Sequence, residues 1–267
     1  MKNHLIISLI VLLFGCSTSE KQSNKKSLIE HIKEYDEDDL IEMDNGLWTE
    51  KFSDKPITGK VYGYFGEVKP YKKVYMGNLL NGKKEGRWKN YYHSTGKKSE
   101  DFNFKNGKEV GLFTEWYENG QKKWEWTYKD GKQDGVETYW FDNGQKKWDT
   151  TFKDGELDGL RTVWYENGQK DFEGTYKDGT RDGLHTEWYE NGQKKYEDIY
   201  KDGKQDGLFI KWYENGQKRR EGTFEDGKKE GFWTRWYENG DKTLEGTYKN
   251  GKKISEKEWN EDGSVKE

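Results

Sequence analysis

A 24-residue period runs through most of this chain and limits what it can fold into. The dipeptide Asn-Gly returns six times at that spacing. Asn-Gly between two aromatic- and Thr-rich runs is the strongest short signal for a β-hairpin, and it predicts a type I′ turn, which needs two positive φ angles. Equal units that contact mainly their neighbours form an elongated array. The predicted turn residues are Asn119, Gly120, Asn143, Gly144, Asn167, Gly168, Asn191, Gly192, Asn215, Gly216, Asn239 and Gly240.

Each unit holds two strand signals, Leu112 to Tyr117 and Lys122 to Tyr128, and a second turn-rich connection from Lys129 to Gly135. The predicted fold is all-β: an elongated single-layer antiparallel β-meander of 24-residue β-hairpin repeats. About 16–18 strands at ~4.8 Å each give a sheet ~75–85 Å long. The one short helix that the pattern allows is Leu28 to Tyr35, and another hairpin is expected between Leu40 and Lys51.

The hairpin register predicts the two faces of the sheet. A two-residue Asn-Gly loop pairs Tyr117 with Lys122, and alternation then separates the side chains. One face carries Leu112, Thr114, Trp116, Lys123, Glu125 and Thr127, and the other carries Phe113, Glu115, Tyr117, Trp124, Trp126 and Tyr128. A structural ladder of stacked rings is expected from Trp116, Trp140, Trp164, Trp188, Trp212 and Trp236. A second ladder, the candidate binding face, is Tyr117, Phe141, Tyr165, Tyr189, Tyr213 and Tyr237.

Composition excludes several classes of protein. Charged residues make up 37% of the chain, which alone would indicate disorder, but 16% of the residues are aromatic, and disordered chains have few aromatic residues. The 47 basic and 51 acidic residues are nearly balanced, so a nucleic-acid partner is not expected. A single Cys excludes a disulfide framework and a cysteine zinc site.

The N-terminus has the pattern of an export signal. Lys2 precedes an apolar run from Leu5 to Phe14, which is too short to span a bilayer and is typical of a signal peptide. Leu13-Phe14-Gly15-Cys16 resembles the cleavage site of a bacterial lipoprotein signal, which implies acyl chains on Cys16. Ser17 in place of Asp implies the outer membrane if the cell has two. The expected divisions are a signal peptide at 1–15, a flexible tether at 16–27, lead-in hairpins and a degenerate repeat at 28–81, and the repeat array at 82–267.

The unit Trp116-Tyr117-Glu118-Asn119-Gly120-Gln121-Lys122, followed by Tyr128 to Gly135, resembles MORN-repeat variants. It is similar to the bacterial subtype called YwqK-family antitoxins, and Pro56 to Val61 resembles the lead-in of that family's array. The resemblance implies an open β-meander that contacts proteins or membranes and has no catalytic activity. An export signal does not fit an antitoxin that acts in the cytoplasm.

No catalytic constellation is expected, because the four His residues share no repeat position and His185 is interpreted as a surface substitution. Acidic pairs in the second turn could hold calcium, but turn formation is the favoured explanation. The Lys pairs beside the Asn-Gly turns could meet phosphate, and the aromatic rows could stack on sugars.

The predicted function is a membrane-anchored, protein-binding scaffold at the cell envelope, with an envelope protein as partner and no cofactor or metal. The alternative is a surface protein that binds carbohydrate or lipid headgroups. The acidic pairs are Asp130 and Asp134, Asp154 and Asp158, Asp178 and Asp182, Asp202 and Asp206, and Asp226 and Glu230.

Overall fold

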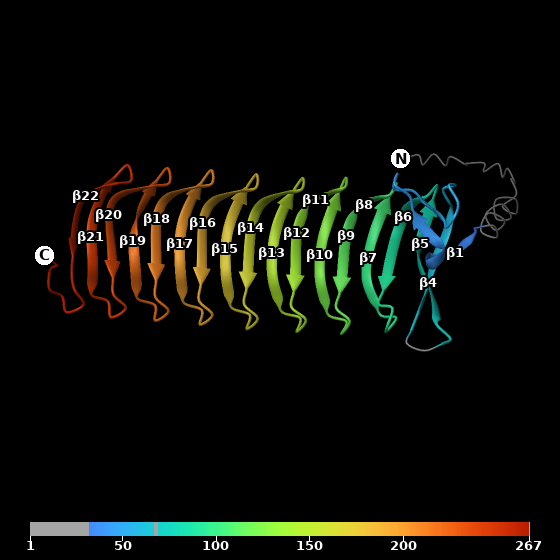
Figure 1. Ribbon diagram of the computed structural model, residues 1–267, viewed down its shortest axis with the longest axis horizontal. Helices are drawn as coiled ribbons and strands as arrows, with labels where there is room; N and C mark the ends of the chain where they lie inside the picture. Colours follow the sequence, from blue (N-terminus) through green and yellow to red (C-terminus); the bar gives the residue numbers. More distant parts are fainter. Residues whose placement is uncertain (1–31, 67–68, 267) are drawn as a thin grey trace, which may run out of the picture.

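A computed structural model describes residues 32–66 and 69–266 of the 267-residue chain. The strands stand side by side in one long row, with the N-terminal elements at one end and β22 at the other (Figure 1). The signal peptide at 1–15, Cys16 and the tether at 16–27 lie outside the described residues, as do Leu28 to His31 of the expected short helix.

The N-terminal region contains short elements and the first long strands. Its elements are β1 (Glu34–Asp36), the 3-10 helix η1 (Glu37–Asp39), β2 (Leu40–Glu42), β3 (Trp48–Glu50), β4 (Gly59–Phe65), β5 (Lys72–Leu80), β6 (Lys83–Tyr91) and β7 (Lys98–Lys105). Strand β1 pairs in parallel with β4, so the end of the expected helix is an extended strand. Strands β2 and β3 form the hairpin expected between Leu40 and Lys51, as a separate two-stranded sheet.

The repeat array follows with two long strands per unit, the first two split by short breaks. Its elements are β8 (Lys108–Glu109), β9 (Gly111–Trp116), β10 (Lys122–Lys129), β11 (Lys132–Gln133), β12 (Gly135–Trp140), β13 (Lys146–Lys153), β14 (Glu156–Trp164), β15 (Lys170–Lys177), β16 (Thr180–Trp188), β17 (Lys194–Lys201), β18 (Lys204–Trp212), β19 (Lys218–Glu225), β20 (Lys228–Trp236), β21 (Lys242–Lys249) and β22 (Lys252–Glu258). From β4 onward, neighbours in sequence pair antiparallel. The main sheet has 20 strands, which confirms the β-meander.

The Asn-Gly turns are not of the predicted type. Gly120 has a φ of 92°, whereas Asn119 is not left-handed. The Gly120 N–H donates to the Tyr117 carbonyl at 2.8 Å, and the Tyr117 N–H donates to the Gln121 carbonyl at 2.8 Å. This geometry is a three-residue loop closed by a glycine bulge. The type I′ prediction is wrong here because the Asn119 side chain accepts the Gln121 N–H at 2.9 Å, which stabilises the turn without a left-handed Asn.

The type I′ turn lies at the other connection of each unit. Asp130 and Gly131 have φ angles of 50° and 80°, and Lys129 pairs with Lys132 across them. Both central residues are left-handed, as a two-residue I′ hairpin requires. The same geometry recurs at Asn81, Asn106, Asp154, Asp178, Asp202, Asp226 and Asn250, each followed by a left-handed glycine.

A bulge beside each Asn-Gly turn corrects the predicted faces of two residues, Lys122 and Lys123. Lys122 pairs with Trp116, and the register then shifts before Trp124 pairs with Glu115. The remaining pairs are those predicted. The shift turns the Lys123 side chain to the opposite face from the predicted one, where its ammonium lies 2.6 Å from the Glu115 carboxylate. We call the face of Leu112, Thr114 and Trp116 the ridge face, and the face of Phe113, Glu115 and Tyr117 the aromatic face.

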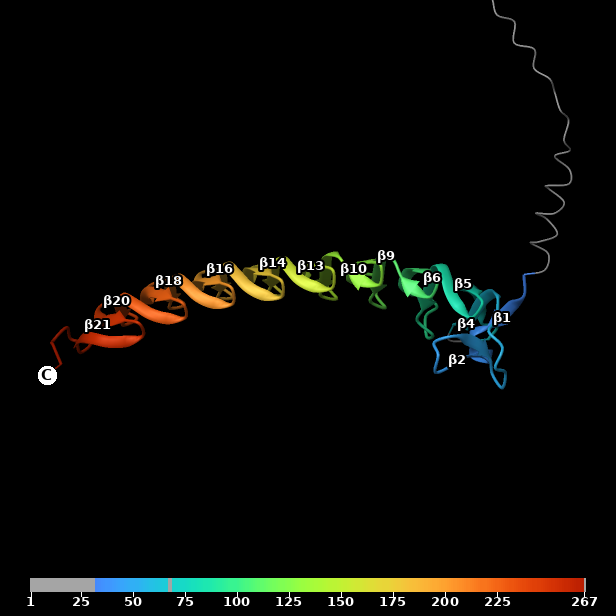
Figure 2. The same ribbon diagram turned by 90° about the horizontal axis from the view of Figure 1, so that it is seen from above.

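The N-terminal region has a conventional hydrophobic core. Nine buried side chains form it: Tyr35, Leu40, Ile57, Val61, Phe65, Met76, Leu79, Trp88 and Phe102. Figure 2 shows β2 lying to one side of the row of strands, where it covers the start of the sheet. Phe113, the first aromatic-face residue of the array, packs against this core. The short N-terminal elements therefore close one end of the aromatic face.

Residues 32–66 and 69–266 include no helix with the length and apolar character needed to cross a membrane.

Candidate functional site

The aromatic face forms a narrow core along the array. A left-handed glycine in every second strand, such as Gly207 with a φ of 133°, bends the strand at a bulge. The segment before the glycine then lies over the face: the Lys229 ammonium, for example, is 5.0 Å from the centre of the Trp233 ring. Trp233 is only 2% exposed, and a Cβ on Gly222 would come within 2.1 Å of its ring. The central ring position of this face, occupied here by Trp233, is therefore closely packed.

His185 belongs to this core, so its interpretation as a surface substitution is wrong. Its side chain is 1% exposed, and its ring packs among Phe172, Tyr176 and Tyr200. Its Nε2 lies 2.8 Å from the Thr175 carbonyl, which can only accept, so Nε2 carries the proton. Burial is the main cause that lowers the pKa of His185. The repeat position that it occupies is the centre of the bent strand, which sequence periodicity alone does not reveal.

The predicted binding row of Tyr117 and its counterparts makes hydrogen bonds from one repeat to the next. The Tyr165 hydroxyl donates to the Trp188 carbonyl at 2.8 Å, and the Tyr189 hydroxyl donates to the Trp212 carbonyl at 2.9 Å. Tyr117, Tyr213 and Tyr237 make the equivalent bond, whereas Phe141 has no hydroxyl. Burial raises the pKa of Tyr165 to about 12, so its hydroxyl keeps its proton. These residues are half-buried and join the units together.

The turn residues also connect units. The Asn119 side-chain amide donates to the Asp142 carbonyl of the next turn at 2.7 Å. Asn167, Asn191 and Asn215 repeat this contact. The Asn-Gly turns thus form a hydrogen-bonded edge along one side of the sheet.

The Trp116 row lies on the ridge face, and lysines separate its rings. The Lys122 ammonium lies 5.4 Å from the centre of the Trp140 ring and 2.5 Å from the Glu125 carboxylate. The same arrangement of Lys, Trp and carboxylate recurs from Lys146 to Lys194. In the described part of the chain, no direct ring contact joins successive members of this row. The expected stack of rings is therefore a mixed row of tryptophans and cations.

An aliphatic ridge that the prediction did not single out lies beside this row. It consists of one large apolar side chain per repeat, with exposed fractions between 41% and 81%. Threonines next to it are buried, Thr162 to 4%. Six apolar residues exposed at one repeat position form a stripe rather than scattered surface residues. The aliphatic ridge is Leu112, Val136, Leu160, Leu184, Leu208 and Phe232.

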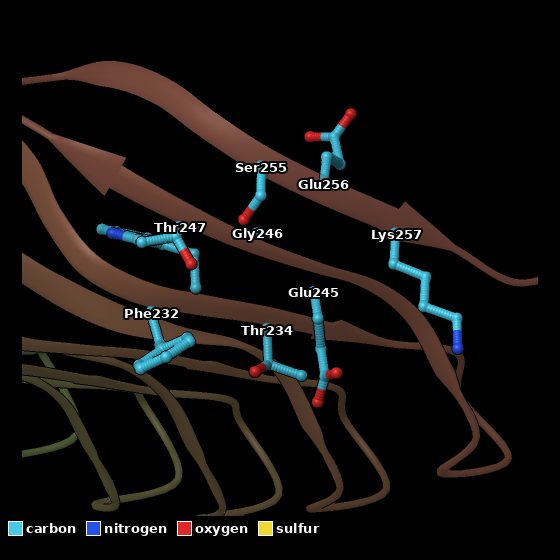
Figure 3. Close-up of a pocket in the computed structure, with 9 residues that line it drawn as sticks. Phe232, Thr234, Glu245, Gly246, Thr247, Ser255, Glu256 and Lys257 are labelled. Atoms are coloured by element: carbon cyan, nitrogen blue, oxygen red, sulfur yellow. The ribbon is translucent and has the colours of Figure 1, made fainter.

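The aliphatic ridge ends in an open groove at the C-terminal edge. Phe232, Thr234, Thr247, Glu245 and Lys257 lie around it, and its volume is about 360 Å³. Figure 3 shows these side chains on one side of the strands, with Glu256 directed to the other side. The residues mix apolar and charged groups. This end of the ridge offers both apolar and charged contacts at one open surface.

The acidic pairs of the second turn take part in structure. The Asn250 N–H donates to the Glu230 carboxylate at 2.7 Å, and the Asp154 N–H donates to the Asp134 carboxylate at 3.5 Å. These carboxylates hold the neighbouring turn. Across residues 32–66 and 69–266, no group of three His, Cys, Asp or Glu side chains has a geometry that could hold a metal ion.

Comparison with known proteins identifies the repeat. The sequence model of the family described as MORN repeat variant matches residues 109–130, 157–178, 181–202, 205–226 and 229–250. The intervening unit, residues 133–154, has the same strands and turns. The search of curated proteins finds no match. This repeat type is non-catalytic and often binds proteins or membranes. Five hairpins of this chain therefore match the model of the MORN repeat variant.

Proposed function

We propose that this protein is a non-catalytic scaffold that binds a protein partner at the bacterial cell envelope, to which acyl chains on Cys16 anchor it. The aliphatic ridge carries the proposal. It places an exposed apolar side chain in every repeat of the array, from Leu112 to Phe232. Apolar stripes of this kind, bordered by polar residues, are typical of protein interaction sites.

The borders of the ridge favour a protein over a sugar as partner. A sugar ring stacks on an open aromatic face, but the ridge-face tryptophans have lysines over their rings, as Lys170 lies over Trp188 at 5.6 Å. These lysines are also paired with carboxylates, Lys170 with Glu173 at 2.5 Å. What remains exposed is the aliphatic row, which a protein surface can cover. The resemblance to YwqK-family antitoxins is consistent with a protein partner.

The proposed anchor places the array outside the cytoplasm. A Cys that ends an apolar run of the right length is the lipidation position of bacterial lipoproteins, and Cys16 is the only Cys of the chain. Several acyl chains give stable membrane attachment, whereas one chain gives marginal binding. Ser17 favours the outer membrane where a second membrane exists.

The experiment is photo-crosslinking in intact cells from a probe at Leu184, followed by mass spectrometry. The identified partner is then purified and its affinity measured by calorimetry. The variant Leu160→Ser/Leu184→Ser/Leu208→Ser should weaken binding at least about tenfold, because it removes three adjacent ridge contacts. The control is Lys153→Ser/Lys177→Ser/Lys201→Ser, which changes three exposed residues that are not part of the aliphatic ridge.

Equal affinity of the ridge variant and the wild type would refute the ridge as the binding surface. The anchor has a separate test. The Cys16→Ala protein should remain an uncleaved precursor without acyl chains. A Cys16→Ala protein that is still cleaved and acylated would exclude the lipoprotein anchor without affecting the ridge.

A further inference from the structure

Three consecutive strands place three cations side by side on the aromatic face. Lys211 of β18 pairs with Arg220 of β19, and Arg220 pairs with Arg235 of β20. Neighbouring strands lie about 4.8 Å apart, and like charges directly opposite each other destabilise a sheet. We call Lys211, Arg220 and Arg235 the basic row.

The same row has a different chemistry in the other repeats. In chain order its other members are Glu115, Trp124, Tyr139, Trp148, Val163, Phe172, Glu187, Tyr196, Leu244 and Glu258. Elsewhere the row is aromatic, apolar or acidic, and a carboxylate such as Glu115 pairs with a lysine. Only at β18–β20 does the repeat position carry three cations in succession. The unfavourable charge is therefore local and not a property of the repeat.

These cations border a small cavity of about 190 Å³, together with Arg219. The Arg220 guanidinium lies 4.6 Å from the centre of the Trp233 ring and 5.4 Å from that of Phe209, so two aromatic rings fix its position. Its Nε is buried and forms no hydrogen bond with any described residue. Lys229 packs over Trp233 from the next turn of the chain. The cavity thus has preformed walls and an unused donor.

No carboxylate in the part of the chain that the structure describes lines the cavity, and the aromatic-face carboxylates on the strands nearby, Asp198 and Glu256, have partners of their own. Asp198 is fully buried and accepts hydrogen bonds at 2.5 Å from both Tyr196 and Gln205. Glu256 lies 2.7 Å from Lys253. Among the described residues, no member of the basic row forms an ion pair, and neither does Arg219 or Lys229. Burial is the main cause that lowers the pKa of Arg220, and the positive charge of Arg235 lowers it further.

We propose that the basic row binds the phosphate group of a small soluble phosphomonoester. A phosphomonoester carries a charge of about −1.5 to −2 at neutral pH, together with three strong acceptor oxygens. Arginine forks match phosphate oxygens in pairs, whereas a single carboxylate would neutralise only one of the cations. The ligand is soluble because the half-buried Arg220 lies between two rings, where a flat bilayer surface does not reach.

The test is titration of the full-length purified protein with inorganic phosphate, followed by ³¹P NMR. Saturable binding is expected, and chloride at matched ionic strength should not compete. Arg220→Gln and Arg235→Gln should each weaken binding at least tenfold. The matched control is Lys147→Gln, which removes a cation of the same face where the row is aromatic. Far-UV circular dichroism establishes that each variant is folded.

Two competitors distinguish a soluble phosphomonoester from a lipid headgroup as the source of the phosphate group: glycerol 3-phosphate, and vesicles of phosphatidylcholine with phosphatidic acid. Glycerol 3-phosphate should displace inorganic phosphate, and the vesicles should not. Displacement by the vesicles would overturn the assignment to a soluble ligand. An absence of saturable phosphate binding, or an equal loss in Lys147→Gln, would overturn the site itself. Arg235 is exposed, whereas Arg220 is half-buried. If Arg220→Gln is misfolded, Arg235→Gln therefore still tests the site.

Discussion

The N-terminal region and the repeat array belong to one sheet but are stabilised in different ways. Residues 34–104 enclose a core of buried apolar side chains under the β2–β3 hairpin. The array has a single layer whose narrow core mixes rings with polar groups such as His185 and Asp198. Its units are joined by bonds between repeats, for example Tyr189 to the Trp212 carbonyl. The comparison indicates that the first region folds as a block, whereas the array gains stability one unit at a time.

Deletions should give the largest difference between the two regions. Removal of residues 159–182 takes out one complete repeat and should leave a folded, shorter protein, because equivalent strands are rejoined. Removal of residues 40–56 takes away the β2–β3 hairpin and should unfold the N-terminal region, because Leu79 and Trp88 lose their cover. Circular dichroism and size-exclusion chromatography measure both outcomes.

A third deletion checks the repeat itself. Loss of 12 residues from one unit joins strands of the wrong direction, so that region should aggregate. Equal damage from the 12- and 24-residue deletions would contradict the meander as a modular array.

Substitution of one tryptophan in each region should give the next largest difference. Trp88 is 4% exposed and its indole N–H donates to the Asn78 carbonyl at 3.0 Å. Trp88→Ala should reduce the free energy of unfolding by about 3–5 kcal/mol. Trp164 is half-buried under Lys146, so Trp164→Ala should cost about 1 kcal/mol. Urea denaturation compares the two, and similar losses would argue against separate modes of stabilisation.

A smaller effect is expected from one bond between repeats. Tyr189→Phe removes the hydroxyl that donates to Trp212 and should lower the free energy of unfolding by about 1 kcal/mol. Phe141→Tyr is the reverse change at the one position of the row without a hydroxyl, and it should stabilise the array. If both variants unfold at the urea concentration of the wild type, the hydroxyl row contributes nothing to stability.

The smallest predicted effect is a pH dependence that belongs to the array. Burial lowers the pKa of His185 below its usual 6.5, so the unfolded chain binds the proton more tightly. The contribution of His185 to stability should therefore be fully present above about pH 6.5 and decrease as the pH falls below it. In His185→Phe, the thermal midpoint should depend less on pH between about pH 5 and pH 8. Phe209 shows that the repeat position holds a phenyl ring. An unchanged pH dependence in the variant would exclude His185 as its source.

The sequence predicts the repeat array better than it predicts the local geometry of the turns. The 24-residue spacing and the pairs from Glu115 to Gly111 are correct, because alternation and turn residues are local signals. The type I′ turn lies at the Asp-Gly connection and not at the predicted Asn-Gly turn, because both dipeptides suit a hairpin and the deciding contact is the Asn119 side chain. The bulge at Lys123 follows from that turn and has no separate signature.

The interior of the molecule was the harder part to predict. His185 is interpreted as exposed in a flat sheet, but the bend at glycines such as Gly207 covers its row. The N-terminal core places residues as distant in sequence as Leu40 and Phe102 in one cluster, which no repeat defines. The predicted alternation puts the residues of the aliphatic ridge on the correct face. Only the exposed fractions of the side chains distinguish them from the buried threonines beside them.

The row of tyrosine-to-carbonyl bonds gives the array a direction. Each bond runs from a donor in one unit to an acceptor in the following unit, and the last one ends at the Trp259 carbonyl. Each added unit thus lengthens the same series by two strands, or ~10 Å at the usual strand spacing, and each lost unit shortens it by the same amount. The distance between the N-terminal block and the final strand can change only in such steps. The number of repeats in this protein therefore sets the distance between the N-terminal region and its final strand, β22.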